Sequence, residues 1–296
     1  MLSMTSEVME GCTRAGYPGP VTGSVPESPV GALLREWRQR RRLSQLDLAL
    51  AAGTSARHLS CVETGKAQPS RAMVLKLCET LDVPLRERNT VLLAGGFAPE
   101  YRERGLDDAE MRSARAALDT ILENHEPYPA VVVDRYWNVV TTNRAMGLFD
   151  SAVPEALRGL PPNMYRYALY PEDPAAPVQL ANYHDVREFL LERLLRQVQA
   201  TGDPVLRDLY EEVSAYPMPP EPETSSPAMP STPFSVPLRI STPRGELRVF
   251  STMVTFGAPS DVTLSELAIE LFYPLDDFTD ESLRAMFELT TRANSV

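Results

Sequence analysis

Residues 44–65, SQLDLALAAGTSARHLSCVETG, decide the fold of the N-terminal region. Ser44 precedes an acidic residue by three positions, an N-cap pattern that predicts a helix beginning directly after it. Gly53 is the residue type that most readily takes the left-handed conformation at a helix end, and one of the two hydroxyl residues after it can cap a second helix. The stretch therefore predicts two short helices joined by a tight turn, the second running to about Glu63.

The side chains of these two expected helices divide into an apolar and an exposed face. The apolar positions are Leu46, Ala49 and Leu50 in the first helix and Leu59 and Val62 in the second. The opposite face of the second helix carries short side chains and one cation: Ala56, Arg57, Ser60 and Cys61. Short side chains let a helix enter a major groove, and an arginine can bind a guanine edge or a phosphate, so this helix is predicted to read DNA.

The flanking sequence continues the helical pattern. Upstream, Val30, Leu33, Leu34 and Trp37 mark a helix whose other face carries Arg35, Arg38, Arg40, Arg41 and Arg42. Downstream, Ser70 caps a helix with Val74, Leu77, Cys78 and Leu81 inward, and a fifth helix contains Val91, Leu92 and Leu93. Five helices within about 70 residues predict a compact all-α domain, which we place at residues 29–93.

Residues 30–93 resemble the XRE/lambda-repressor-like helix-turn-helix family, through the LSQ opening, the AG turn, the LSxVExG helix and the GKAQPS loop. An ordinary helical bundle whose arginines only solvate a surface is the alternative. With the pattern above, the resemblance implies these DNA-binding residues: Arg38, Ser44, Gln45, Ser55, Ala56, Arg57, Ser60, Cys61, Thr64 and Lys66.

The resemblance also implies individual roles. Gln45 would cap the second helix and touch the phosphate backbone, and Arg38 would form a partly buried salt bridge with Glu63 at the end of the recognition helix. Ala56 and Cys61, at base-facing positions, have little hydrogen-bonding capacity. Sequence readout is therefore expected to rest largely on Arg57 and on DNA shape.

The charge distribution fits a nucleic-acid partner for the N-terminal domain only. The whole chain has a net charge of −11. Residues 29–104 nevertheless hold 13 Lys and Arg against 8 Asp and Glu, whereas residues 105–296 hold 15 against 29. The positive charge is concentrated where the helix-turn-helix pattern lies, which favours double-stranded DNA as the partner of that part of the chain.

The remaining composition bounds the class of protein. A chain of 296 residues can form two separate cores, and it contains no apolar run long enough to span a bilayer. Residues 1–28 are rich in Gly, Pro and Ser and lack a secretory pattern, so they are expected to form a flexible tail. Cys12, Cys61 and Cys78 have no metal-ligand spacing. We expect a cytoplasmic protein without membrane contact and without a metal or other cofactor.

A second domain is expected after a linker. Residues 94–110, AGGFAPEYRERGLDDAE, break the helical periodicity as a hinge between domains would, and the second domain is placed at 111–296. A helix from about Asp108 to Glu123 is followed by PYPAVVVDRYWNVVTTN, which predicts strands at 130–134 and 139–142 around a turn.

The order of the later elements predicts an α+β domain of PAS-like type. A helical segment contains Tyr183, Val186, Phe189, Leu190 and Leu194, and later strands are expected at 238–240, 247–255 and 267–273. Between them, YPMPPEPETSSPAMPSTP is proline-rich, and we expect an exposed or partly disordered loop.

Residues 94–275 resemble the ligand-binding region of the MmyB-like transcription regulators, through YRERGLDD, HEPYPAVVVDRYWNVVTTNRA, LRVFSTMVTFGAP and DVTLSELAIELFYP. The resemblance implies a PAS-like domain that holds a small apolar ligand, with a fatty acid or similar amphiphile as the expected class. Such a ligand needs an apolar wall and donors for its carboxylate. Donor candidates are Tyr136, Arg144, Tyr165, Arg166 and His184; wall candidates are Trp137, Phe149, Phe189, Met253 and Phe256.

The sequence thus predicts a regulator that binds DNA, as a homodimer on a two-fold site, and senses a small apolar molecule. The alternative is a second domain that only dimerises or binds a protein partner. A catalytic role is not expected, because the chain has no GxSxG or phosphate-loop pattern and its three histidines lie far apart. The operator, the direction of regulation, the identity of the ligand and the place of the dimer interface stay open.

Overall fold

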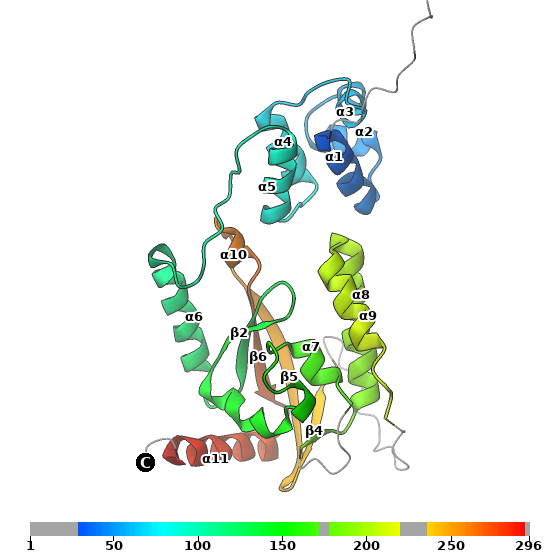
Figure 1. Ribbon diagram of the computed structural model, residues 1–296. Coiled ribbons are helices and arrows are strands. Elements are labelled where there is room, and N and C mark those ends of the chain that lie inside the picture. Colours follow the sequence, from blue (N-terminus) through cyan, green and yellow to red (C-terminus); the bar gives the residue numbers. More distant parts are fainter. Residues whose placement is uncertain (1–28, 172–177, 220–235, 294–296) are drawn as a thin grey trace, which may run out of the picture.

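A computed structural model describes residues 29–171, 178–219 and 236–293. A helical N-terminal domain lies at one end of an α+β domain, and the two are joined by an extended segment (Figure 1). The expected tail and most of the proline-rich stretch fall outside the described residues. No helix in the described ranges is long and apolar enough to cross a membrane.

The N-terminal domain contains the five helices predicted from the sequence. They are α1 (Pro29–Arg40), α2 (Gln45–Ala51), α3 (Ala56–Glu63), α4 (Arg71–Thr80) and α5 (Leu85–Ala94). Ser44 caps α2 in a complete capping box with Asp47, and Ser55 caps α3 through the backbone N–H of His58. Gly53 takes φ +68, the left-handed conformation expected at the end of α2. Ser44, rather than Gln45, is therefore the cap of α2, which corrects that part of the prediction.

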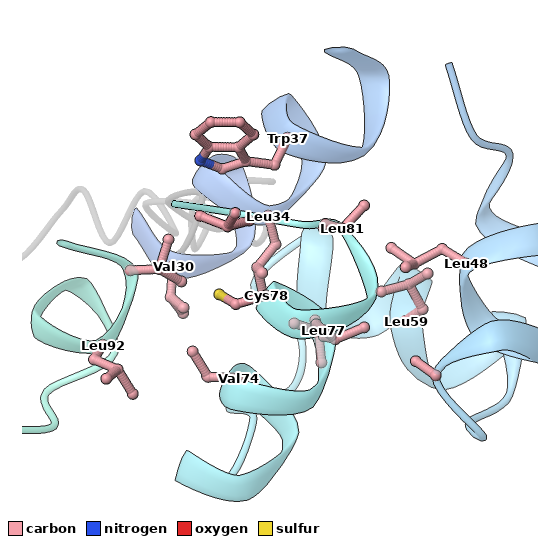
Figure 2. Packing of buried hydrophobic residues seen from close by; sticks show 14 of the residues in the cluster. Val30, Leu34, Trp37, Leu48, Leu59, Val74, Leu77, Cys78, Leu81 and Leu92 are labelled. Carbon is pink, nitrogen blue, oxygen red and sulfur yellow. The ribbon is translucent and has the colours of Figure 1, made fainter. Parts of the chain in front are cut away.

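The core of this domain is built from all five helices (Figure 2). Its fully buried side chains include Leu34, Leu59 and Leu77, each at most 1% exposed. The apolar face predicted for α2 is confirmed at Ala49 but wrong at Leu46 and Leu50, which are 58% and 70% exposed. Leu48 and the two alanines Ala49 and Ala52 turn inward instead, since only that side of this short helix meets α3 and α4. Leu93 in α5 is also exposed.

Helices α1 and α3 cross closely at Gly31. A Cβ atom at this position would lie 2.2 Å from the carbonyl oxygen of Val62, too close for any side chain. Glycine therefore sets the distance between the first helix and the helix that is predicted to read DNA.

The second domain has a six-stranded sheet covered by helices on both faces (Figure 1). Its strands are β1 (Ala130–Val133), β2 (Val139–Thr142), β3 (Gln179–Leu180), β4 (Leu238–Thr242), β5 (Gly245–Thr255) and β6 (Ala268–Pro274). Its α-helices are α6 (Arg112–His125), α7 (Met164–Leu169), α8 (Tyr183–Thr201), α9 (Pro204–Ser214), α10 (Val262–Ser265) and α11 (Asp277–Ala293). Short 3-10 helices occupy Ala109–Met111, Arg144–Ala152 and Glu155–Leu157.

The strand order is β2-β1-β6-β5-β4-β3, and every neighbouring pair is antiparallel. Strand β1 is buried on both faces, which explains its unbroken AVVV sequence. Val131 and Val133 pack with α7, α8 and α9, whereas Ala130 and Val132 pack with α6. The α+β PAS-like fold predicted from the sequence is therefore confirmed, with the strands and the long helix α8 in the expected places.

The segment between the domains is held at both ends. Asn89 of α5 binds the backbone N–H and carbonyl of Tyr101, at 3.1 and 2.6 Å. The carbonyl of Arg102 accepts from the N–H of Val262, at the start of α10. Residues 101–102 of the expected linker are therefore tied to the helical domain on one side and to the sheet domain on the other.

Candidate functional site

The predicted DNA-reading helix α3 has the surface that the sequence suggests. Leu59 and Val62 are buried, as predicted, while Arg57 is exposed and Ala56, Ser60 and Cys61 are half-buried. Ser55 lies before the helix as its cap, and Thr64 ends it by donating to the carbonyl of Ser60 at 2.7 Å. Lys66 follows in an exposed turn. The helix thus presents short side chains around one exposed cation.

A buried carboxylate ties this helix to α1 and α2. Glu63 is 0% exposed, and Arg38 binds it in a fork, with Nε 2.7 Å from Oε1 and Nη2 2.8 Å from Oε2. The side-chain amide of Gln45 donates to the same carboxylate at 2.8 Å. Burial alone would raise the pKa of Glu63, but the hydrogen bonds from Arg38 and Gln45 outweigh it and hold this pKa below its ordinary value. The salt bridge implied by the resemblance is present.

This cluster engages two of the predicted DNA-binding residues, Arg38 and Gln45, in contacts inside the domain. The third nitrogen of Arg38 donates to the carbonyl of Leu43 at 2.9 Å, so all three of its nitrogens bind within the domain. Arg38 and Gln45 therefore act through Glu63, by fixing α3 against α1 and α2. Arg41 likewise donates to the carbonyl oxygens of Leu81 and Asp82, directly after α4, at 2.8 and 2.7 Å. The expected arginine-rich face of α1 is thus partly used inside the domain.

The second domain contains a cavity of about 810 Å³ between the sheet and helices α7 and α8. This volume falls within the range of about 300–1,000 Å³ that small-molecule sites occupy. Its apolar wall includes Val139, Met146, Phe149, Met164, Ala168, Val186, Phe189, Leu190, Leu238, Ile240, Val249, Met253 and Phe272. The cavity lies on the same face of the sheet as the core shared by α7, α8 and α9.

Among the residues that the structure describes, two charged side chains line this cavity. Arg193 of α8 donates through Nε to the hydroxyl of Tyr165 at 2.9 Å, and its guanidinium lies 4.2 Å from the Trp137 ring centroid. Among the described residues, no carboxylate forms an ion pair with Arg193. Glu270 of β6 is 7% exposed and accepts from the hydroxyl of Ser251 at 2.7 Å. Burial raises the pKa of Tyr165, although the charge of Arg193 opposes this.

The cavity brings together four of the ten ligand residues predicted from the sequence. Phe149, Tyr165, Phe189 and Met253 line it. The six others are not among its lining residues: Tyr136, Trp137, Arg144, Arg166, His184 and Phe256.

The six remaining residues have other surroundings. Arg144 binds Glu126, and Arg166 binds Glu212 in a fork at 2.7 and 2.8 Å. Trp137 donates to Gln197, and Tyr136 lies beneath Arg135 at the domain interface. Phe256 packs on the opposite face of the sheet, and His184 stacks edge-on with Tyr183. Of the five predicted donors, Tyr165 alone is among the described residues that line the cavity.

Sequence reasoning missed the two charged residues of the cavity, although both left a signal. On α8, Val186, Phe189, Leu190 and Arg193 follow one another at helical spacing, so an arginine continues an apolar stripe. Glu270 interrupts the apolar strand AIELFYP in the same way. A charge at a position that the pattern reserves for apolar side chains was the available signal.

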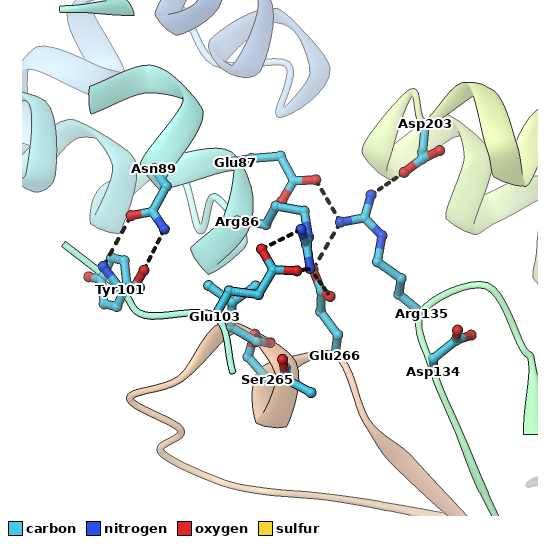
Figure 3. A network of polar contacts seen from close by, with 12 residues as sticks. Arg86, Glu87, Asn89, Tyr101, Glu103, Asp134, Arg135, Asp203, Ser265 and Glu266 are labelled. Carbon is cyan, nitrogen blue, oxygen red and sulfur yellow. Dashed lines mark hydrogen bonds and ion pairs between the residues drawn. The ribbon is translucent and has the colours of Figure 1, made fainter. Parts of the chain in front are cut away.

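The two domains meet in a network of ion pairs (Figure 3). Arg86 of α5 binds Glu103 of the connecting segment and Glu266 at the end of α10, with Nε 2.7 Å from Glu266 Oε1. Arg135, in the β1–β2 turn, binds Glu266 at 2.9 Å and Glu87 of α5 at 3.2 Å.

The same network reaches the helix that lines the cavity. Arg135 also binds Asp203, which caps α9 directly after the end of α8. Burial disfavours the charge of Arg135, but hydrogen bonds to Glu266 and Asp203 outweigh it and raise its pKa. Glu266 lies two residues before β6, which carries Glu270. The end of α8 and the start of β6 are therefore both tied to α5 of the helical domain.

The fold and these sites define a helix-turn-helix DNA-binding regulator with a second domain of the ligand-binding type. The family model for the helix-turn-helix domain matches residues 29–91. The model for the MmyB-like transcription regulator ligand binding domain matches residues 114–286, more than half of the chain. The chain therefore belongs to the MmyB-like transcription regulator family.

Two solved structures show low overall similarity to this chain. The restriction-modification controller protein C.AhdI from Aeromonas hydrophila is 36% identical over 21% of this chain and 92% of its own, with a TM-score of 0.20. An RNA-binding light-oxygen-voltage receptor is 12% identical over 90% of this chain and 64% of its own, with a TM-score of 0.23. No curated protein matches the sequence.

Proposed function

We propose that this regulator binds operator DNA through α3, as a cytoplasmic homodimer, and that a fatty acid or similar amphiphile in the cavity of its second domain controls this binding. We propose no enzymatic activity for this protein. The observation that carries it is an apolar cavity of about 810 Å³ with one arginine, Arg193, that has no carboxylate partner among the described residues.

The proposed DNA contacts follow from the surface of α3. Arg57 is the exposed cation on the helix and would read a base, while Ser55, Thr64 and Lys66 would contact phosphates. Dimers of helix-turn-helix proteins bind two half-sites about one helical turn apart, so the operator is expected to have two-fold symmetry.

The proposed ligand follows from the charges of the cavity. A carboxylate beside Arg193 would gain a charge-assisted hydrogen bond, and an alkyl chain would fill the apolar space. Glu270, on the sheet side of the cavity, would repel the ligand's carboxylate and so favours a ligand whose acid end lies beside α8. Ligand binding would shift the population of domain arrangements by acting on α8 and β6, which connect to α5 through Arg135 and Glu266.

The experiment that tests the ligand class uses tetradecanoate, tetradecan-1-ol and tetradecylamine as probes. The delipidated full-length chain is titrated with each by displacement of the fluorescent fatty acid cis-parinarate. The acid should bind tightest and lose about tenfold or more in affinity in Arg193→Gln, because a charge-assisted hydrogen bond contributes about 1.5–3 kcal/mol. The alcohol should be affected much less.

Arg196→Gln is the matched control, because Arg196 lies one turn further along α8 and pairs with Glu192 on the exposed side. It should leave the affinity for the acid unchanged. Absence of binding by all three probes would contradict the ligand class. It would favour the alternative, in which the second domain only dimerises or binds a protein partner.

A further inference from the structure

Strand β6 carries a carboxylate in the middle of an apolar surface. Glu270 lies between Val131 of β1 and Met253 of β5, its partners on either side in the sheet. Side chains along a strand alternate between the two faces, and Phe272 of β6 packs in the core shared with α7, α8 and α9. Glu270 therefore points to this same face, where it lines the cavity.

This carboxylate is buried with little to balance its charge. Glu270 is 7% exposed, and Ser251 donates its hydroxyl to Oε1 at 2.7 Å. Within the described residues, Ser251 is its one side-chain donor, and no cation forms an ion pair with it. A buried carboxylate loses far more hydration than a single hydroxyl restores. Glu270 is thus an anion in the cavity wall that a positive charge would stabilise.

The segments that adjoin the cavity wall in the sequence contain no residue able to supply this positive charge. Residues 172–177 and 220–235 flank the lining residues Val178 and Val236. They read EDPAAP and PEPETSSPAMPSTPFS, with four acidic residues and no Lys, Arg or His. The chain that borders the cavity thus offers Glu270 no cation, whereas a molecule inside the cavity can.

The other charge of the cavity lies near the same part of the wall. Arg193 donates to the hydroxyl of Tyr165 at 2.9 Å. Burial is the main cause that raises the pKa of Tyr165, and the negative charge of Glu270 adds to it. Because interactions between charges weaken with distance, Tyr165 lies near both Arg193 and Glu270. A ligand that meets both charges therefore needs its own two charges only a few bonds apart.

We propose that the ligand carries an ammonium group next to its carboxylate, with the carboxylate bound by Arg193 and the ammonium bound by Glu270. This rests on the proposed function and deepens it by naming the class of amphiphile, an amino acid with a long alkyl chain. A simple fatty acid brings its carboxylate close to an unbalanced carboxylate. An ammonium group between the two replaces this repulsion by attraction to both.

The test uses three probes that differ at one carbon atom: 2-aminotetradecanoate, 2-hydroxytetradecanoate and tetradecanoate. Each displaces cis-parinarate from the delipidated full-length chain near neutral pH, where the amino group carries a positive charge. The probes share one reporter, so the ratio of their affinities does not depend on how tightly the reporter binds. The wild-type chain should bind the amino acid more tightly than either other probe, because a hydrogen bond between two charged groups is stronger than one from a neutral hydroxyl.

Glu270→Gln removes the charge but keeps the shape and an oxygen that can accept from Ser251. The preference for the amino acid over the hydroxy acid should fall about tenfold or more, since the bond lost joins two charged groups. Tetradecanoate should bind as tightly as before or more tightly, because the repulsion is gone, and this shows that the cavity is intact. Arg193→Gln should weaken all three probes, since each has a carboxylate.

Glu192→Gln is the matched control, because it removes a carboxylate from the exposed side of α8, where Glu192 pairs with Arg196. It should leave the preference unchanged.

Two results would overturn the proposal: a wild-type chain without preference for the amino acid, or a preference that survives in Glu270→Gln. The first needs no variant, so it decides the matter even if Glu270→Gln does not fold. If tetradecanoate binds in either case, the ligand-sensing function stands and only the ammonium assignment fails. Failure of all three probes to displace the reporter would contradict the proposed function itself, and this assignment with it.

Discussion

Breaking the buried pair between Arg38 and Glu63 should destabilise the helix-turn-helix domain by an amount that the structure allows to be estimated. Replacing either residue by an apolar one of similar size leaves the other charge without its fork of hydrogen bonds. The loss of one partner of a buried ion pair costs about 3–5 kcal/mol. We expect about 3 kcal/mol for Arg38→Met and for Glu63→Leu, because Arg38 keeps 12% of its side-chain surface in water and Glu63 keeps Gln45 as a donor.

The double variant should be less damaging than the sum of the single ones. An apolar pair leaves no buried charge, so a coupling energy of about 2–3 kcal/mol is expected. The assay is urea unfolding followed by tryptophan fluorescence. The chain has two tryptophans, Trp37 in the helical core and Trp137 in the second domain, so a Trp137→Phe background leaves Trp37 as the reporter.

Lys76 and Glu79 provide the matched control in the same domain, because they form an exposed pair at 3.2 Å. Glu79→Gln should change the free energy of unfolding by less than about 0.5 kcal/mol. Additive effects of Arg38→Met and Glu63→Leu, with coupling below about 0.5 kcal/mol, would refute the role given to this pair in holding α3 against α1.

Three further predictions concern pH, DNA and the domain interface. The pKa of Glu63 is lowered in the folded state, so ionised Glu63 stabilises the fold above the unfolded pKa of about 4.3, and this stabilisation is lost as pH falls through the folded pKa. The free energy of unfolding should therefore fall less steeply with pH below about pH 4 in Glu63→Gln. Arg57→Ala should cost about 1–3 kcal/mol on a selected duplex and relax its sequence preference, whereas Lys66→Ala should weaken all duplexes alike and lower the salt slope by about one, as measured by anisotropy. Equal losses on selected and random duplexes for both variants would contradict the assignment of Arg57. Arg135→Gln should leave the affinity for tetradecanoate unchanged but reduce its effect on DNA affinity, and an unaltered effect would exclude this network as the connection.

The helical domain was predictable because its signals are local. The Ser44 cap, the turn at Gly53 and the stripe of Leu59 and Val62 all lie within one stretch of chain, and each is confirmed. The prediction failed where packing decides: α2 is too short for periodicity to tell which side meets the core, so Leu46 and Leu50 were assigned to the wrong face. Tertiary contacts override such a short pattern.

The cavity was less predictable because its wall comes from segments far apart in the sequence. Phe149, Phe189 and Met253 meet only when the sheet and α8 have packed together. The predicted arginines lie outside the cavity for a similar reason, since Arg144 and Arg166 each have a carboxylate partner that is distant in the sequence. Arg193 could have been found as the charge in an apolar helical stripe. The ion pairs between the domains follow from the domain arrangement, which sequence patterns do not contain.

The central claim, that occupation of the cavity controls DNA binding, is tested most directly by one titration. A duplex selected from a random pool is bound by the delipidated full-length chain, and its dissociation constant is measured by anisotropy with and without saturating tetradecanoate. Coupling between two sites is typically 1–3 kcal/mol, so we expect a change of about fivefold or more, reduced in Arg193→Gln at the same tetradecanoate concentration. A dissociation constant that stays the same while tetradecanoate is bound would contradict the account.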